Sequence, residues 1–179
     1  MTDKDELPEA HPAIEPLEFL LGRWEGFGKG DYPTIEAFDF IQEVTFTHNG
    51  KPFLIYNSRT WLKETDAEGN VTKGRPLGME TGFWRPQPNG EVEVILAHPT
   101  GISEIYLGRI SANRVDLITD AVARTSSAKE VTGGKRLYGL VDSPNRPGEK
   151  DLAYAYDMAA VDQPLQPHLW AQLEWSWTE

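Results

Sequence analysis

Cysteine is absent from the 179-residue chain, and this absence excludes several chemistries at once. Without a thiol the protein forms no disulfide, carries no thiol nucleophile, and holds neither a thiolate-bound metal nor a cysteine-held iron–sulfur cluster. Any transition metal must then be bound chiefly through nitrogen or oxygen atoms. The four histidines, at positions 11, 48, 98 and 168, are therefore the leading candidate ligands.

Long apolar runs and excess positive charge are also lacking. No run approaches the roughly 18 apolar residues of a membrane-spanning helix, and residues 1–6 are acidic where a signal peptide would be basic and then apolar. Asp and Glu outnumber Lys and Arg by 28 to 17, which gives a formal charge of −11. This charge argues against nucleic acid and anionic membranes as partners. We expect a cytoplasmic protein, and the sequence leaves a homodimer open.

Glycines recur at every second position around one tryptophan near the start of the chain. Gly22, Gly26, Gly28 and Gly30 share the parity of Trp24, so in an extended segment all five lie on one face. The glycines clear space beside the indole and let another backbone approach closely. The pattern predicts a first strand whose Trp24 plugs the bottom of a β-barrel.

Beyond Ile35 the apolar residues alternate with period two, and turn signals follow at short intervals. We expect about ten strands in all, a hairpin turn at Asn49-Gly50, and a long exposed loop at 66–76. The absence of any βαβ alternation favours an all-β fold, namely an antiparallel up-and-down barrel without free edges. A two-sheet sandwich is the competing architecture, because it produces the same local pattern.

Before the first strand, Ile14, Leu17, Leu20 and Leu21 recur at helical spacing. This predicts a short N-terminal helix that caps one end of the barrel. Residues 1–12 are polar with two prolines, and we expect them to form a mobile leader. Residues 13–179 show no composition shift that marks a second domain, so a single barrel domain is expected there.

Three of the four histidines have simple structural interpretations. His11 lies in the expected leader and His48 at an expected hairpin tip, so both should be solvated. His98 ends a run whose alternate residues Val92, Val94 and Leu96 are apolar. We interpret His98 as a core histidine with a hydrogen-bond partner.

His168 directly follows Pro167 at the expected start of the last strand, which is a position at the mouth of a barrel. Strict alternation places His168 on the same face as Trp170, whereas Leu169 and Ala171 form the more apolar face. An inward-facing His168 therefore requires either a bulge or a position before regular strand pairing begins.

Three motifs together carry a resemblance to a known family. They are Gly22-x-Trp24-x-Gly26-x-Gly28 with the following Tyr32-Pro33-Thr34-Ile35, then Ser127-Ala128-Lys129-Glu130, and Pro164-Leu165-Gln166-Pro167-His168-Leu169. A Gly-x-Trp alone also opens the first strand of lipocalins and fatty-acid-binding proteins. The full set resembles the nitrobindin family of haem-binding β-barrels, from about Leu17 to about Trp175.

The resemblance implies a barrel that holds one b-type haem per chain. His168 matches the axial histidine of the family and would be both the metal ligand and the catalytic residue. By the same matching, Lys129 would pair with a haem propionate and Thr34 would contact the porphyrin through its hydroxyl. The implied activity is isomerisation of peroxynitrite to nitrate at ferric haem, together with reversible binding of nitric oxide.

One segment departs from the family pattern. The family carries a threonine-rich turn before Pro164, and here residues 158–163 read Met-Ala-Ala-Val-Asp-Gln without a hydroxyl. The surroundings of the haem would differ accordingly, and haem affinity is the property affected. Two alternative functions stay open from the sequence: a metal-free carrier of a small apolar ligand, and a haem-free nitrobindin-like paralogue.

Overall fold

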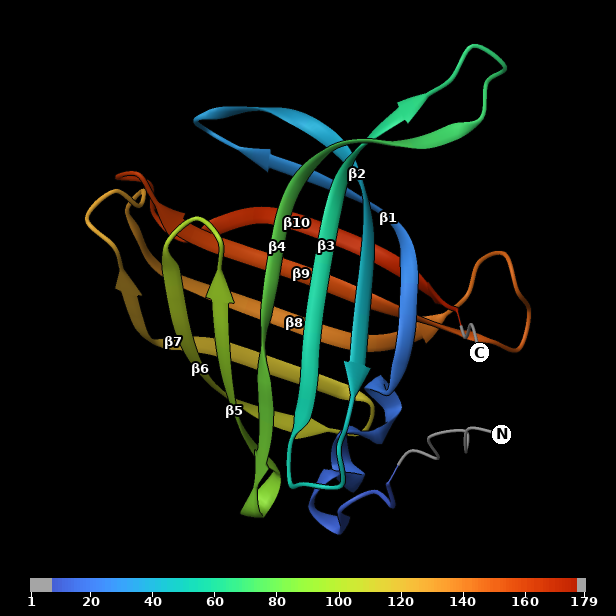
Figure 1. Cartoon of the computed structure of the whole chain (residues 1–179), viewed down its shortest axis with the longest axis vertical. Coiled ribbons are helices and arrows are strands. Elements are labelled where there is room, and N and C mark those ends of the chain that lie inside the picture. The colour runs from blue at the N-terminus through green and yellow to red at the C-terminus, as the bar shows by residue number, and fades with distance from the viewer. Residues whose placement is uncertain (1–7, 177–179) are drawn as a thin grey trace, which may run out of the picture.

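Ten antiparallel strands close into a barrel (Figure 1). Along much of their length buried residues alternate with more exposed ones. The computed structural model describes residues 8–176. The strands are β1 (Gly22–Tyr32), β2 (Ile35–Thr47), β3 (Leu54–Thr65), β4 (Val71–Gln87), β5 (Glu91–His98), β6 (Ile102–Ser111), β7 (Arg114–Arg124), β8 (Val131–Asp142), β9 (Lys150–Ala160) and β10 (Gln166–Trp175). Each strand pairs with its neighbours in sequence and β1 closes on β10. The predicted up-and-down barrel is confirmed, and the sandwich is excluded.

A 3-10 helix, η1 (Pro12–Leu20), covers the lower end of the barrel in Figure 1. Its Ile14, Leu17 and Leu20 are fully buried, which confirms the predicted cap. Residues 1–7 of the expected leader lie outside the described residues. No helix within residues 8–176 is long and apolar enough to span a membrane. A single turn of 3-10 helix, η2 (Pro88–Gly90), joins β4 to β5.

Trp24 is buried near this capped end, where its indole nitrogen donates a hydrogen bond to the Leu20 carbonyl at 2.8 Å. The glycines of β1 allow neighbouring strands to approach closely, as the sequence predicts. A Cβ at Gly26 would collide with the backbone of Gln172 on β10, and one at Gly28 with the ring of Phe40 on β2. Strand β1 is therefore packed tightly against both of its neighbours, β2 and β10.

The β3–β4 hairpin corrects one prediction, because residues 66–76 do not form a long loop. Pairing continues out to Thr65 opposite Val71, and the arm projects beyond the barrel (Figure 1). The Asp66 carboxylate accepts hydrogen bonds from the backbone N–H groups of Glu68 and Asn70, which closes a compact turn. Residues 71–76 therefore lie on β4, and the turn itself is limited to residues 66–70.

The Asn49-Gly50 pair also differs from prediction, since it does not form a two-residue hairpin. Strand β2 ends at Thr47 and β3 begins at Leu54, so the connection spans residues 48–53. Within it, His48 accepts a hydrogen bond from the Gly50 N–H through Nδ1 at 3.3 Å. Gly50 has a φ of 78°, so the glycine is still required for the turn.

Candidate functional site

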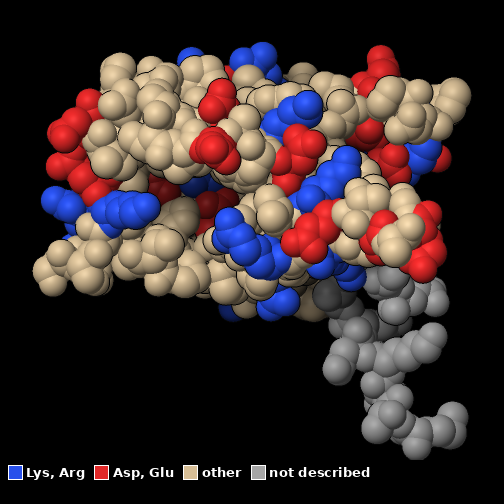
Figure 2. Space-filling model, turned by 90° about the horizontal axis from the view of Figure 1, so that it is seen from above, with Lys and Arg blue, Asp and Glu red and all other residues tan. Residues whose placement is uncertain are grey.

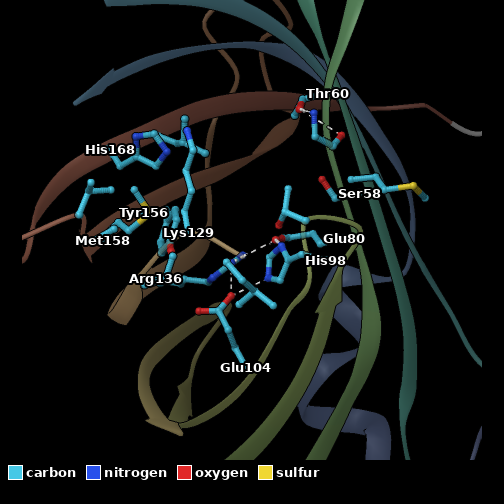
Figure 3. A pocket seen from close by; sticks show the side chains of 18 of the residues that line it. Ser58, Thr60, Glu80, His98, Glu104, Lys129, Arg136, Tyr156, Met158 and His168 are labelled. Carbon is cyan, nitrogen blue, oxygen red and sulfur yellow. Dashed lines mark hydrogen bonds and ion pairs between the residues drawn. The ribbon is translucent and has the colours of Figure 1, made fainter. Parts of the chain in front are cut away.

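The barrel encloses a cavity of about 600 Å³. Figure 3 shows Met158, Tyr156 and His168 on one side of it and Ser58 and Thr60 on the other. Further apolar side chains line it from β4, β6, β8 and β10: Met79, Ile102, Val131 and Leu169. In Figure 2, which looks down on the barrel from above, acidic and basic atoms are visible in the depth of a hollow. The cavity therefore combines an apolar wall with a charged interior.

His168 lines this cavity because the β9–β10 ladder is irregular at that point. The register shifts between Pro167 and Leu169, and His168 has no paired partner on β9. The extra residue lets both His168 and Leu169 line the cavity, while Trp170 stays exposed on the outside. The bulge accounts for the conflict between strand parity and an inward-facing histidine.

The His168 imidazole is oriented by its neighbours. Its Nδ1 lies 3.1 Å from the carbonyl oxygen of Asp31 on β1, so Nδ1–H donates and Nε2 is left as the lone-pair atom. The rings of Tyr32 and Tyr156 pack edge-on against the imidazole, with centroids 5.2 and 5.8 Å away. Nε2 has no hydrogen-bond partner among residues 8–176, so it is available to a ligand in the cavity.

Burial lowers the pKa of His168 below its ordinary value, and the Asp31 carbonyl opposes this effect only in part. The neutral imidazole is therefore favoured at physiological pH. A metal binds the neutral form, because the proton and the metal compete for the same lone pair.

Lys129 and Thr34, the other two site residues suggested by the sequence, lie in different surroundings. Lys129 is exposed in the β7–β8 loop and lines the cavity (Figure 3). It forms no ion pair with any residue between 8 and 176. Thr34 lies in the exposed turn between β1 and β2 and is not among the residues that line the cavity. The structure thus brings Lys129 and His168 together but not Thr34, whose porphyrin contact stays a prediction.

A cluster of charged side chains, Arg136, Glu80 and Glu104, forms the floor of the cavity (Figure 3). Arg136 is 1% exposed. Its two terminal nitrogens lie 2.7 and 3.1 Å from the two carboxylate oxygens of Glu80 in a bidentate pair. One of these nitrogens also lies 3.4 Å from Glu104. The three residues come from β8, β4 and β6, so only the closed barrel brings them together.

Tyrosine hydroxyls complete this floor cluster. Tyr56 donates to Glu80 and Tyr106 donates to Glu104, both at 2.6 Å. Burial raises the pKa of the Glu80 and Glu104 carboxyls, but the cations and hydroxyls around them more than offset this, and both pKa values end below their ordinary range. Both residues are therefore carboxylates at neutral pH, each with hydrogen-bond donors.

His98 belongs to the same network. Its Nε2 lies 2.6 Å from Oε1 of Glu104, which confirms the predicted hydrogen-bond partner, although His98 is half-buried at the cavity and not in the core. Its Nδ1 lies 3.6 Å from Glu80. His98 is thus held between two carboxylates, whereas His168 faces the cavity with a free nitrogen. His11 lies outside the cavity, where it accepts a hydrogen bond from the Ala13 N–H and caps η1.

These residues fit a haem with one protein ligand. Within residues 8–176 no group of three or more His, Asp or Glu side chains is arranged to hold a metal ion. A single free imidazole nitrogen in an apolar-walled cavity suits an iron whose other ligands come from a porphyrin. Sequence reasoning missed the floor cluster, although strand parity places Arg136 on the same face as the buried Tyr138, and Glu104 on that of Tyr106.

Comparisons with known proteins agree with this geometry. The family model described as "THAP4-like, heme-binding beta-barrel domain" matches residues 13–174. A peroxynitrite isomerase of Nocardioides sp. is 53% identical, with 94% of this chain and 96% of that protein covered. A ferric nitrobindin-like protein of Thermobifida fusca is 43% identical, with 93% and 95% covered.

A solved structure is similar as well. The crystal structure of Rv2717c from M. tuberculosis superimposes with a TM-score of 0.78 at 39% sequence identity, and the match covers 94% of this chain and 99% of that one. The resemblance to nitrobindins is thereby confirmed over almost the whole length. With its closed barrel and its free cavity histidine, this chain belongs to the family of THAP4-like, heme-binding β-barrel domains.

Proposed function

We propose that this protein binds one b-type haem through His168 and isomerises peroxynitrite to nitrate at the ferric iron. The observation that carries the proposal is the His168 imidazole, whose Nδ1 is bound to the Asp31 carbonyl and whose Nε2 is free at the wall of a cavity of about 600 Å³. Relatives that align over more than nine-tenths of the chain bear the name peroxynitrite isomerase, which supports the choice of reaction.

A ferric haem held by His168 would supply a Lewis acid for the isomerisation, in which the O–O bond of peroxynitrite is exchanged for a new N–O bond to give nitrate. Isomerisation leaves the number of electrons unchanged, so the reaction needs neither a reductase nor a nucleotide cofactor. The same haem iron would also bind nitric oxide reversibly. We include both activities in the proposal, together with a cytoplasmic location; homodimer formation stays a prediction.

The residues of the chain have distinct parts in this function. His168 provides the neutral nitrogen, and the Asp31 carbonyl holds the proton on the opposite ring nitrogen so that the lone pair points toward the cavity. The apolar wall around Met158 and Leu169 excludes water from the bound ring system. Lys129, an exposed cation at the cavity, is positioned to pair with an anionic propionate.

The floor cluster argues against a carrier of fatty acids, the main metal-free alternative. A buried arginine at the bottom of a barrel would suit a carboxylate head group only if it were free. Here Arg136 is already paired with Glu80 and lies 3.4 Å from Glu104. A fatty acid carboxylate would meet two like charges there, which costs binding energy in a low-dielectric site.

The test is a hemin titration of the purified apoprotein followed by a peroxynitrite assay. We expect a Soret band that saturates at one equivalent of hemin, and a nitrate yield above the spontaneous background. His168→Ala should lose most haem affinity while melting close to the wild-type apoprotein. His48→Ala, which removes an imidazole outside the cavity, is the matched control and should bind hemin normally. A wild-type Soret spectrum in His168→Ala would refute the assignment.

A further inference from the structure

In the turn that joins β9 to β10, Val161 has a positive φ, which is unfavourable for valine. The Gln163 N–H donates to the Ala160 carbonyl at 2.9 Å and closes a four-residue turn. Its two central residues, Val161 and Asp162, have φ angles of 51° and 60°. Positive φ at both central positions is the mark of a type I′ turn, in which Asn and Gly are favoured.

Val161 is unusual among the residues with positive φ. The other non-glycine residues of this kind between 8 and 176 are Asn89, Asn113 and Asp162. Asn and Asp tolerate the left-handed region, whereas a β-branched residue there is a genuine outlier. Such strain persists only where the surrounding structure imposes it, and it is concentrated at functional sites.

Hydrogen bonds to two neighbouring segments hold the turn in this conformation. The Val161 N–H donates to the Glu130 carbonyl at 3.1 Å, which ties the turn to the loop that carries Lys129. The Ala160 N–H donates to the hydroxyl of Tyr32 at 2.9 Å, and the ring of Tyr32 packs against His168. The strained turn is thus fixed to the segments on either side of it, the β7–β8 loop and β1.

The Val161 side chain lies where it touches the cavity. Val161 lines it together with Ala160 and Met158 of the same segment, and also with His168, while 41% of its surface stays exposed. Asparagine or glycine would relieve the backbone, but neither would present two methyl groups at this rim. The chain therefore keeps a destabilising residue at a point where its side chain faces the cavity, and Asp162, which does not line the cavity, is a type that the conformation tolerates.

We propose that Val161 is a haem-contacting residue, whose methyl groups cover the apolar surface of the bound haem at the rim on the side of His168. The proposal rests on the haem function given above. In this chain residues 158–163 carry no hydroxyl, and Val161 would provide an apolar contact to the haem there instead. The positive φ of Val161 destabilises the apoprotein in return for this contact.

The test compares Val161→Asn with Asp162→Asn, which places the same side chain one position further along the same turn but outside the cavity. Two quantities are measured: the melting temperature of the apoprotein, and the rate of hemin transfer to excess apomyoglobin. Val161→Asn should raise the apoprotein melting temperature by about 2–6 °C. It should also speed hemin transfer about three- to tenfold, because a half-buried valine contact is lost.

Asp162→Asn should change neither quantity by much, and Val161→Ile, which keeps the branched side chain, should transfer hemin no faster than wild type. Equal transfer rates in Val161→Asn and wild type would overturn the proposal, and so would an apoprotein of Val161→Asn that melts at or below the wild-type temperature. A wild-type protein that forms no hemin complex would overturn the haem function as well. A normal wild-type complex together with unchanged transfer would overturn the Val161 proposal alone.

Discussion

Replacing Arg136 by methionine is a direct test of the floor cluster. The substitution keeps an unbranched side chain of similar length but removes the charge that Glu80 and Glu104 share. Both carboxylates would then be buried without their cation. Breaking a buried ion pair in this way costs about 3–5 kcal/mol. For a chain of this size we expect the apoprotein melting temperature to fall by roughly 6–20 °C.

The pH dependence of the loss identifies its cause. In the wild type, the pKa values of Glu80 and Glu104 lie below their ordinary range, so their contribution to stability is present above an unfolded pKa of about 4.3 and is lost as the pH falls through the folded values. In Arg136→Met, burial acts with less opposition and raises both pKa values. The carboxyls then favour folding only when protonated, so the difference from wild type should grow as the pH rises from 4 to 8.

The assay is urea unfolding of the two apoproteins at several pH values, followed by tryptophan fluorescence and far-ultraviolet circular dichroism. A variant that also carries Glu80→Gln and Glu104→Gln should recover part of the loss, because no uncompensated charge remains. If Arg136→Met lowered the free energy of unfolding by less than about 1 kcal/mol, by the same amount at every pH, the charged cluster would be solvated. That result would refute the interpretation of the cluster as a buried ion-pair network.

Four further outcomes are expected. Trp24→Ala should lower the free energy of unfolding by about 3–5 kcal/mol through the cavity it leaves, without changing the hemin spectrum; wild-type stability would show that the indole is not a plug. Tyr32→Phe should cost about 1–3 kcal/mol, because it leaves the buried Ala160 N–H unpaired, while the ring against His168 remains; an unchanged urea midpoint would contradict this. Hemin binding should weaken as the pH falls, with a midpoint below the ordinary histidine value of about 6.5, since burial lowers the His168 pKa; a titration midpoint above that value would be the wrong sign. Lys129→Ala should speed hemin loss up to about fivefold at low ionic strength and less at high salt, and equal rates at low salt would exclude a propionate pair.

The barrel could be predicted from the sequence because its determinants are local. Period-two alternation and the glycines of β1 specify strands and close packing, and the helical spacing of Ile14, Leu17 and Leu20 specifies the cap. His98 was also predictable, since its strand places it beside Val94 and Leu96 on an inward face. Each of these features depends on residues within one element.

The rest depends on contacts between distant strands. Glu80, Glu104 and Arg136 meet because β4, β6 and β8 curve around a common axis, and no single strand contains that information. The bulge at His168 depends on how β10 pairs with β9. Residues 66–76 look like a loop because they are polar, but residues 71–76 belong to β4, which pairs with β3.

The Val161 turn could not be predicted for a similar reason. Local preference argues against valine at positive φ, and only the bonds to Glu130 and Tyr32 explain why the chain accepts it there. Lys129 lines the cavity and Thr34 does not, although both lie in exposed connections between strands. Motif matching identifies such residues as candidates without giving their positions in space.

The closure of the barrel between β1 and β10 has a consequence for folding kinetics. Gly30 pairs with Leu169 across this β1–β10 seam, and the hydrogen bond between Asp31 and His168 also crosses it. The residue that orients the imidazole is therefore 137 positions away in sequence from the histidine itself. Contacts of such long range form late and slowly, because loop-closure entropy opposes them. During synthesis the hydrogen bond that orients His168 can form only after β10 has left the ribosome. Haem that binds to His168 would then reinforce the seam that closes last, so the cofactor should slow unfolding more than it speeds folding.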